Sequence, residues 1–244
     1  PLPSAACKTV MQQFEGTVAA ITVFNEAAYE LAVDMPESAP SFLPGQYSNM
    51  DVPGSSQHRS YSFSSAPGEH RVTFLVKHIP GGLMSSWLAG ASSGEPLKMT
   101  GPLGSFYLRA VTRPLLFLAG GTGLAPFLSM LEELADKGTT QPMHMIYGAT
   151  RDQDLVLVDK LQEYARRVPG FTFTTCVADP QTTHERQGYV TNHMPAQALH
   201  GGNVDVYLCG PPPMVEAVQA HFKSQGMEPT SFHYEKFIPN PATA

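Results

Sequence analysis

This sequence lacks the features that mark several large classes of protein. No apolar run approaches the ~18 residues of a membrane-spanning helix, and the N-terminus shows no signal-peptide pattern. Lysine and arginine number 15 against 21 acidic residues, which gives a formal net charge of −6, and they never form a block of five. Binding to nucleic acid or membrane is therefore disfavoured, and we expect a soluble, cytoplasmic protein.

Cysteine is scarce as well. The three cysteines, Cys7, Cys176 and Cys209, are widely spaced and form no Cys-x-x-Cys motif. This pattern argues against a disulfide framework, a zinc site or an iron–sulfur cluster held by this chain alone. Methionine is missing from the first position, which is Pro1, so we expect a processed product, an excised domain or a sequence that lacks its start.

An apolar fraction of 42% is enough for real cores, and the residue pattern changes near position 112. We expect a tail over 1–13, a first domain over 14–111 and a second over 112–244. Short β-type runs around one short helix in the first domain predict a small antiparallel β-barrel. The expected elements are strands at 17–24, 29–34, 47–52, 59–63, 71–77 and 97–99 and a helix at 83–88, with a turn at 101–104 closing this half.

The second domain alternates strands with helices, which predicts a doubly wound parallel sheet covered by helices on both sides. In such a sheet, ligands bind at the carboxyl ends of the strands. The expected strands are 115–119, 143–147, 171–177, 204–208 and 232–237, and the expected helices are 126–137, 159–167 and 214–225.

A glycine turn follows the first of these strands, with the sequence Gly120, Gly121, Thr122, Gly123. Without Cβ atoms the backbone can approach a phosphate closely, and the free N–H groups of the next helix point at the anion. The spacing differs from the Gly-x-Gly-x-x-Gly fingerprint of dinucleotide sites. The alternative is that these glycines only make a tight turn.

The strand at 204–208 ends in Cys209, Gly210 and Pro211, followed by two more prolines and Met214. A cysteine at the carboxyl tip of a parallel strand lies where ligands bind, and the prolines fix a rigid turn into the next helix. The alternative is a buried structural cysteine, since most free cysteines are buried.

In the first domain, Arg59, Ser60, Tyr61 and Ser62 share one predicted strand. Strand alternation places Arg59 and Tyr61 on one side and the two serines on the other. A guanidinium beside an aromatic ring suits a ligand with both a phosphate and a flat ring system. An ordinary half-buried strand explains the same pattern.

A second candidate phosphate cradle lies at the start of the helix at 83–88, where an N-terminal capping region is the simpler explanation. Its residues are Gly81, Gly82, Leu83, Met84 and Ser85.

Taken in order, these motifs resemble those of the ferredoxin-NADP reductase family. The matching segments are Arg59–Ser62, Gly82–Ser85, Gly101–Gly104, Gly120–Pro126 and Cys209–Met214. The resemblance covers residues 14–239.

Further segments resemble the reductase components of benzoate, halobenzoate and anthranilate 1,2-dioxygenases: Phe42–Tyr47, Pro80–Ser86, Gly101–Leu108 and Tyr234–Phe237. Those reductases carry a plant-type [2Fe–2S] ferredoxin domain in front of the flavin domain. That domain is missing here, and residues 1–8 look like its trailing end, so the resemblance assigns the iron–sulfur centre to the parent protein and not to this chain.

The resemblance implies an FAD-binding barrel. Arg59 would bind the flavin pyrophosphate, Tyr61 would stack on the isoalloxazine, and Ser62 would lie near its N5 atom. Other implied FAD contacts come from Ser60, from Lys77 and His78 near the ribityl or adenosine portion, from Gly82, Leu83, Met84 and Ser85 at the phosphates, and from Phe237 at the flavin ring.

The resemblance also implies a nicotinamide dinucleotide site in the second domain. Its members would be Gly120, Gly121, Thr122 and Gly123 at the pyrophosphate, and Cys209, Gly210 and Pro211 around the nicotinamide. With Ser62 and Cys209, the acid Glu235 would complete a catalytic set that acts by positioning and electrostatics rather than by hydrolase-type acid–base chemistry.

The choice between NADH and NADPH depends on the segment after the strand at 143–147. Arg151 is a candidate partner for the 2′-phosphate of NADPH, but Asp152 and Asp154 flank it and would repel a second phosphate. The dioxygenase reductases that the chain resembles use NADH, so we expect NADH.

The sequence thus predicts a reductase module that transfers hydride from NADH to FAD and then passes single electrons to a [2Fe–2S] ferredoxin domain or protein serving a ring-hydroxylating oxygenase. Two alternatives stay open. One is a stand-alone ferredoxin or flavodoxin reductase, and the other is a non-catalytic flavin-binding electron-transfer subunit that docks on a larger enzyme without using a nicotinamide.

Overall fold

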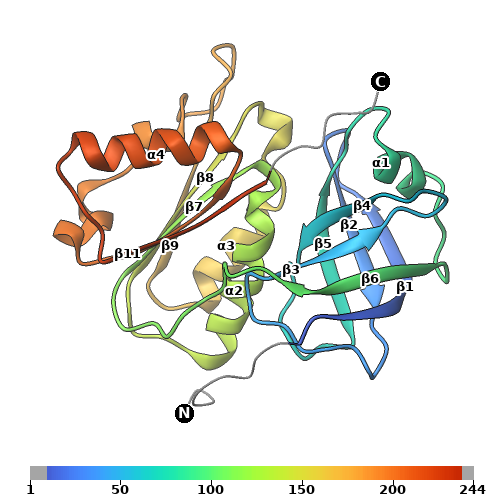
Figure 1. Cartoon of the computed structure of the whole chain (residues 1–244). Helices are drawn as coiled ribbons and strands as arrows, with labels where there is room; N and C mark the ends of the chain where they lie inside the picture. The colour runs from blue at the N-terminus through green and yellow to red at the C-terminus, as the bar shows by residue number, and fades with distance from the viewer. Residues whose placement is uncertain (1–9, 238–244) are drawn as a thin grey trace. The chain divides into compact units, whose positions relative to one another are not determined.

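The computed structural model describes residues 10–237, and its contacts divide the chain into two compact units (Figure 1). The division falls between residues 110 and 111, and residues 128–133 group with the first unit. No helix within the described range is long and apolar enough to cross a membrane.

The first unit is built on an antiparallel sheet of six strands in the order β4-β3-β6-β1-β2-β5. The two outer strands approach each other as well, because Phe63 bridges Phe74 and the backbone N–H of Ser64 donates to Thr73 O at 2.8 Å. The sheet is therefore an almost closed barrel. Its elements are β1 (Gln12–Val23), β2 (Ala28–Asp34), β3 (Tyr47–Asp51), β4 (His58–Ser62), β5 (Arg71–Lys77), α1 (Leu83–Leu88) and β6 (Pro96–Leu103).

The barrel core consists of apolar side chains that alternate along the strands, as half-buried strands require. Phe63 lies at its centre, with its ring stacked on Phe42 at a centroid distance of 3.8 Å and tilted against Phe74 at 5.0 Å. Met84 and Leu88 of α1 pack against this core. The helix therefore covers the barrel through its two apolar positions one turn apart.

Two boundaries in the barrel differ from the sequence prediction by more than one residue. The strand β1 begins at Gln12 and not at residue 17, because Gln12–Thr17 pairs with Gly101–Pro96 of β6. The predicted turn at 101–104 is wrong for its first three residues, which continue β6 as far as Leu103, where Tyr47 of β3 pairs with it. Cross-strand pairing decides both cases, and a pattern read along one segment does not contain that information.

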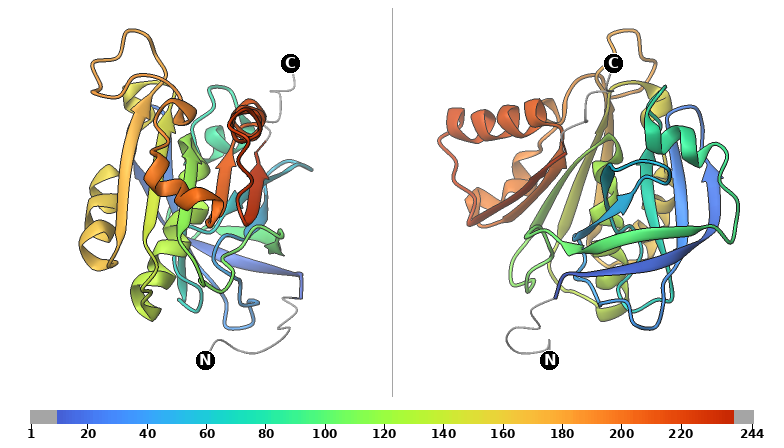
Figure 2. Two further views of the ribbon diagram at one scale, coloured as in Figure 1. Left: turned by 90° about the vertical axis from the view of Figure 1, so that its left-hand side faces the viewer. Right: turned by 45° about the vertical axis from the view of Figure 1, so that its right-hand side comes forward.

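The second unit is a parallel sheet of five strands in the order β11-β10-β7-β8-β9, flanked by helices (Figure 2). The strands are β7 (Leu115–Gly120), β8 (Met143–Ala149), β9 (Phe171–Val177), β10 (Asp205–Gly210) and β11 (Ser231–Lys236). The α-helices are α2 (Ala125–Lys137), α3 (Val158–Arg167) and α4 (Pro212–Ser224), and the 3₁₀ segments are η1 (Gly121–Leu124), η2 (Asp152–Asp154), η3 (Val190–Asn192) and η4 (Ala196–Gly202).

Both faces of this sheet are covered, as the doubly wound prediction requires. On one face Leu116 and Leu118 form a core with Val215 and Val218 of α4 and with part of η4. On the other face the ring of Phe117 packs against Phe127 of α2 at 5.1 Å. The prediction of a β-barrel followed by a doubly wound parallel-sheet domain is confirmed. The polar segment after β9 contains η3 and η4, which its composition did not predict.

Candidate functional site

The carboxyl ends of β7 and β10 form the topological switch point of the parallel sheet. After β7 the chain adds β8 and β9 on one side and later returns to place β10 on the other. Ala119 pairs with Cys209, so the glycine turn and the Cys209–Pro211 turn emerge side by side. In open α/β sheets this is the crevice where ligands bind.

Within the glycine turn, Gly121 is the residue with open space above it. Its φ is +53°, which favours glycine, and a Cβ built on it would meet no heavy atom within 4 Å. Gly121 begins η1, which runs directly into α2, and the first backbone N–H groups of such a helical segment have no intrahelical acceptor. An anion such as a dinucleotide pyrophosphate fits this arrangement.

The other two glycines of the turn are required for packing. A Cβ on Gly123 would lie 2.4 Å from the carbonyl oxygen of Cys209 and 3.0 Å from the ring of Phe237, and a Cβ on Gly120 would lie 2.6 Å from the Met214 sulfur. Packing against neighbouring atoms therefore accounts for Gly120 and Gly123, whereas Gly121 has a turn conformation that favours glycine and an open position that packing does not require. Thr122, between them, is partly exposed.

Cys209 and Glu235 are direct neighbours across the β10–β11 pair. The Cys209 residue is 2% exposed, and burial together with the nearby Glu235 carboxylate raises the pKa of its thiol well above the ordinary value. Such a cysteine stays a neutral thiol at neutral pH, so it shapes its surroundings and does not act as a nucleophile.

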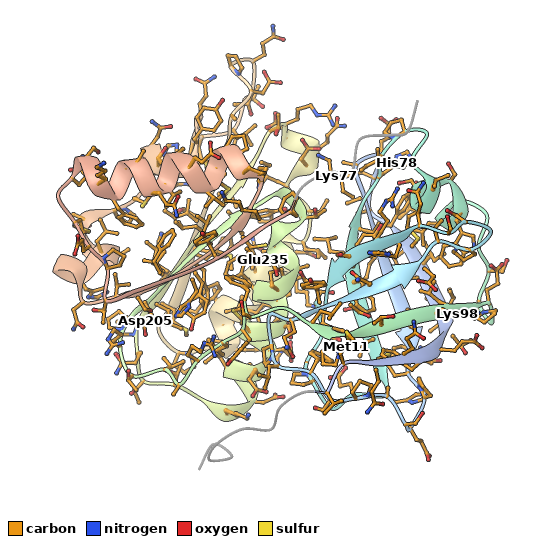
Figure 3. The ribbon with its side chains drawn as sticks, in the orientation of Figure 1. Met11, Lys77, His78, Lys98, Asp205 and Glu235 are labelled. Atoms are coloured by element: carbon orange, nitrogen blue, oxygen red, sulfur yellow. The ribbon has the colours of Figure 1, made fainter. Side chains whose placement is uncertain are left out.

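Burial raises the pKa of Glu235 to about 7. This carboxyl group is therefore able to hold or release a proton near neutral pH. Figure 3 shows Glu235 near the carboxyl end of the sheet, with Asp205 at the opposite end of the neighbouring strand. Phe237 follows β11 and donates its backbone N–H to Gly210 O at 3.3 Å, which places the Phe237 side chain beside Gly123.

Arg151 lies just beyond the carboxyl end of β8, and Asp154 holds its side chain. The guanidinium is 3.3 Å from an Asp154 carboxylate oxygen, and the backbone N–H of Arg151 donates to the same carboxylate at 3.0 Å. Asp152 accepts a hydrogen bond from the Thr182 hydroxyl at 2.6 Å. The Asp154 carboxylate thus pairs with this arginine, an arrangement that opposes binding of a further phosphate.

In the barrel, β4 carries the second group of candidate residues. Its register with β3 is regular, with Arg59 opposite Met50 and Tyr61 opposite Ser48, so the Arg59 and Tyr61 side chains share one face. The Arg59 guanidinium donates to His58 O, in the first residue of β4, and to Gln57 Oε1, just before the strand, both at 2.8 Å.

Tyr61 packs partly against the barrel core, and burial raises the pKa of its phenol above the ordinary value although the Arg59 charge acts in the opposite direction. On the other face, the Ser60 hydroxyl donates to Asn49 Oδ1 at 2.6 Å, and Ser62 is partly exposed. A cation and an aromatic ring are therefore adjacent on one strand, which fits a ligand with a phosphate and a flat ring.

The segment before α1 is folded tightly on itself. The Ser85 hydroxyl oxygen accepts the backbone N–H of Ile79 at 2.9 Å, and Met84 and Ser85 are 3% and 4% exposed, so these two side chains serve the local fold. Gly82 is the N-cap residue, and a Cβ there would lie 3.0 Å from Ile79 O. Leu83, by contrast, is 39% exposed and accessible to a ligand.

Lys77 and His78 follow directly at the end of β5, where Figure 3 labels them. Lys77 is exposed, and His78 Nδ1 lies 2.9 Å from the carbonyl oxygen of Glu26 while its ring packs edge-on against Tyr29 at 5.3 Å. Among residues 10–237, no group of three or more His, Cys, Asp or Glu side chains is arranged to hold a metal ion.

Comparisons with known proteins match both halves of the chain. Residues 18–107 match the family model of the oxidoreductase FAD-binding domain, and residues 117–220 match that of the oxidoreductase NAD-binding domain. The chain is 48% identical over 239 residues to the toluate 1,2-dioxygenase electron transfer component of Pseudomonas putida, covering 97% of this chain and 71% of that protein. It is 44% identical over 241 residues to the 2-halobenzoate 1,2-dioxygenase electron transfer component of Burkholderia cepacia, with the same two coverages.

The chain belongs to the family of 1,2-dioxygenase electron transfer components. Among solved structures, a cytochrome P450 reductase of Amycolatopsis superposes with a TM-score of 0.84 at 29% identity, covering 94% of this chain and 71% of that one. The resemblance seen in the sequence motifs is confirmed, and this electron transfer component is an FAD- and NADH-dependent oxidoreductase.

Two features of this electron transfer component were missed by the sequence reasoning. One is Met214, which packs against Gly120 and Gly210 at the switch point. The other is Asp205, which accepts hydrogen bonds from the Arg113 guanidinium at 3.0 and 3.2 Å and from the Ser231 hydroxyl at 2.6 Å. A single acidic residue at the start of an apolar strand was the only sequence feature pointing to this buried ion pair.

Proposed function

We propose that this chain is the flavin reductase module of a ring-hydroxylating dioxygenase system, which takes hydride from NADH onto FAD and delivers single electrons to a [2Fe–2S] centre. The observation that carries this proposal is the switch-point crevice, where the open Gly121 lies in the same crevice as the Cys209–Glu235 pair. When bound, FAD supplies the coupling of two-electron nicotinamide chemistry to one-electron acceptors.

In this proposal the second unit holds and orients the coenzyme. The backbone around Gly121, Thr122 and Gly123 binds the pyrophosphate, with Gly121 making the closest approach. Cys209, as a buried neutral thiol, and the Gly210–Pro211 turn give the nicotinamide pocket a fixed, water-poor wall. Near-attack geometry between the two reacting rings is the main contribution that such a site makes to the rate.

Glu235 has a different role in the proposal. With a pKa of about 7, its carboxyl group holds a proton at mildly acidic pH and releases it as the pH rises. In this proposal the Glu235 carboxyl group is therefore a titratable group next to Cys209, and it can accept or release the proton that accompanies electron transfer.

The first unit binds FAD in this proposal. Arg59 is assigned to the pyrophosphate, Tyr61 to the flavin ring and Ser62 to the vicinity of N5, and their common strand supports these roles. The residues at the start of α1 and at the end of β5 contribute less to FAD binding in this proposal. The side chains of Met84 and Ser85 are buried, and the Ser85 hydroxyl already accepts a backbone hydrogen bond. The remaining assigned contacts are Ser60, Lys77, His78, Gly82, Leu83 and Phe237.

The partners are a [2Fe–2S] ferredoxin domain or protein and, through it, a terminal ring-hydroxylating oxygenase, with the cytoplasm as the location. The names of the two relatives, which are electron transfer components of toluate and 2-halobenzoate 1,2-dioxygenases, support this assignment. The ion pair between Arg151 and Asp154 supports NADH rather than NADPH as the reductant.

The test is to purify the chain with FAD and add NADH without oxygen. We expect the flavin absorbance to bleach, ferricyanide to be reduced rapidly, and cytochrome c to be reduced only slowly. A flavin that NADH does not bleach would favour the non-catalytic subunit, and efficient reduction of cytochrome c by this chain alone would refute the need for a separate [2Fe–2S] relay.

A further inference from the structure

Met214 occupies an unusual position at the switch point of the parallel sheet. A Cβ built on Gly120, at the end of β7, would lie 2.6 Å from the Met214 sulfur, and a Cβ built on Gly210, at the end of β10, would lie 2.6 Å from the same atom. One thioether sulfur therefore fills the space next to the Cα atoms of two neighbouring strand ends.

The backbone conformation gives no other reason for glycine at position 120. Its φ of −119° and ψ of 114° are ordinary strand values that any residue adopts. Apart from the sulfur, the nearest atoms to a Cβ on Gly120 are Pro211 Cδ at 3.3 Å and Gly210 Cα at 3.5 Å, contacts that small shifts relieve. Met214 is thus the principal obstacle to a larger residue at this position.

The start of α4 holds Met214 in place. Pro211 is the N-cap residue, with φ −66° and ψ 155°, and prolines occupy the first two helical positions, so three restricted φ angles precede the methionine. Its backbone N–H donates to Pro211 O at 3.0 Å, and its side chain packs partly buried against the α4 face of the sheet. An unbranched thioether is suited to filling a narrow gap between two backbones.

We propose that Met214 is a positioning residue for the coenzyme. Its side chain forms a wedge that fixes the distance between the glycine turn after β7 and the Cys209–Pro211 turn after β10. These are the two backbone segments to which the coenzyme is assigned, and the inference therefore rests on the proposed function. This role does not require Met214 to contact the coenzyme.

The proposal is tested first by a double-mutant cycle of Gly120→Ala and Met214→Ala, measured by urea unfolding of the FAD-loaded protein. Gly120→Ala is expected to raise the unfolding equilibrium constant at least tenfold more in the wild-type background than in the Met214→Ala background. Equal effects in the two backgrounds would show that the sulfur does not enforce glycine and would overturn the wedge, whatever the protein does with NADH.

The second test measures NAD⁺ binding by titration calorimetry and FAD content by absorbance. Met214→Ala is expected to raise the Kd for NAD⁺ about tenfold with full FAD content, and Met214→Leu, which retains most of the volume, to raise it less than threefold. The control is Met227→Ala, because Met227 is a partly buried methionine on the same core cluster. It should lower stability without changing the Kd.

An unchanged Kd in Met214→Ala, or an equal increase in Met227→Ala, would overturn the positioning role. Failure of the proposed function is a separate result, since it would appear as wild-type protein that does not bind NAD⁺.

Discussion

Substitution of Gly123 by alanine tests the packing of the glycine turn most directly. The new Cβ would lie 2.4 Å from the Cys209 carbonyl oxygen and 2.9 Å from its carbon, both of which are backbone atoms of β10. No rotamer change relieves such an overlap, so η1 and β10 must separate locally. Overpacking in a core costs about 1–3 kcal/mol, and a rigid backbone neighbour places this case near 3 kcal/mol.

Gly121→Ala in the same turn should behave differently. It meets no atom within 4 Å, so only its left-handed φ of +53° opposes alanine, at a cost of about 1 kcal/mol. Because the open side of Gly121 is where the pyrophosphate is assigned, we expect the loss of NAD⁺ affinity to exceed what this strain explains. Gly201→Ala is the matched control, since Gly201 has the left-handed φ of +62° and ψ of +23°, an equally open Cβ position and a place in η4, before the amino end of β10.

Urea unfolding and NAD⁺ titration of the three variants together separate the packing role of Gly123 from the phosphate role assigned to Gly121. Gly121→Ala and Gly201→Ala should lose similar stability, with only the first losing affinity, and Gly123→Ala should lose the most stability. A Gly123→Ala protein as stable as the wild type would refute the packing argument, and equal NAD⁺ affinity in Gly121→Ala and Gly201→Ala would refute the phosphate assignment.

Three further outcomes are expected. Asp205→Asn weakens a buried ion pair with Arg113 and should lower the free energy of unfolding by about 2 kcal/mol in urea titrations without changing NAD⁺ affinity, because it lies at the opposite end of β10. Glu235→Gln should stabilise the protein by about 3 kcal/mol at pH 8 and by nothing at pH 4. The pKa of Glu235 is about 7 in the folded protein against an ordinary 4.5, so the charged carboxylate destabilises the fold. The loss of folding free energy develops as the pH rises from 4.5 to 7. A difference in stability between the two proteins that does not change with pH would contradict this prediction. Asp154→Ala should remove the Asp154 ion pair from Arg151, a 55% exposed side chain, and raise the NADPH to NADH ratio of kcat/KM by roughly twofold to fivefold, the range that an exposed ion pair supports. An unchanged ratio would remove this ion pair from coenzyme selection.

Local sequence patterns predicted the bounds of a strand or helix correctly wherever the residues of that segment alone determine its structure. The strand at 71–77 and the helix at 83–88 have the predicted bounds because apolar alternation and a one-turn apolar spacing are local properties. The start of β1 at Gln12 was missed, since two glutamines become strand only by pairing with Gly101 and Thr100 of β6.

The candidate site shows the same limit. Its motifs predicted turns after β7 and β10, and the structure has turns there, because glycines and prolines restrict the backbone locally. They did not separate the open Gly121 from the packed Gly123, because that difference depends on how close the backbone of β10 comes. Nor did they reveal that a methionine fills the space beside Gly120, since side-chain packing across strands far apart in sequence leaves no local pattern.

The strand order of the second unit also determines when the switch point can form. Ala119 pairs with Cys209, so the switch point is absent until β10 has been synthesised and docked beside β7, long after the last barrel strand ends at Leu103. A nascent or truncated chain that ends before β10 would contain every barrel strand and the glycine turn, yet not the Cys209–Pro211 turn that pairs with it. The barrel is thus complete in sequence well before the switch point to which we assign the coenzyme, and the switch point forms only with long-range contacts, which are the slow ones in folding.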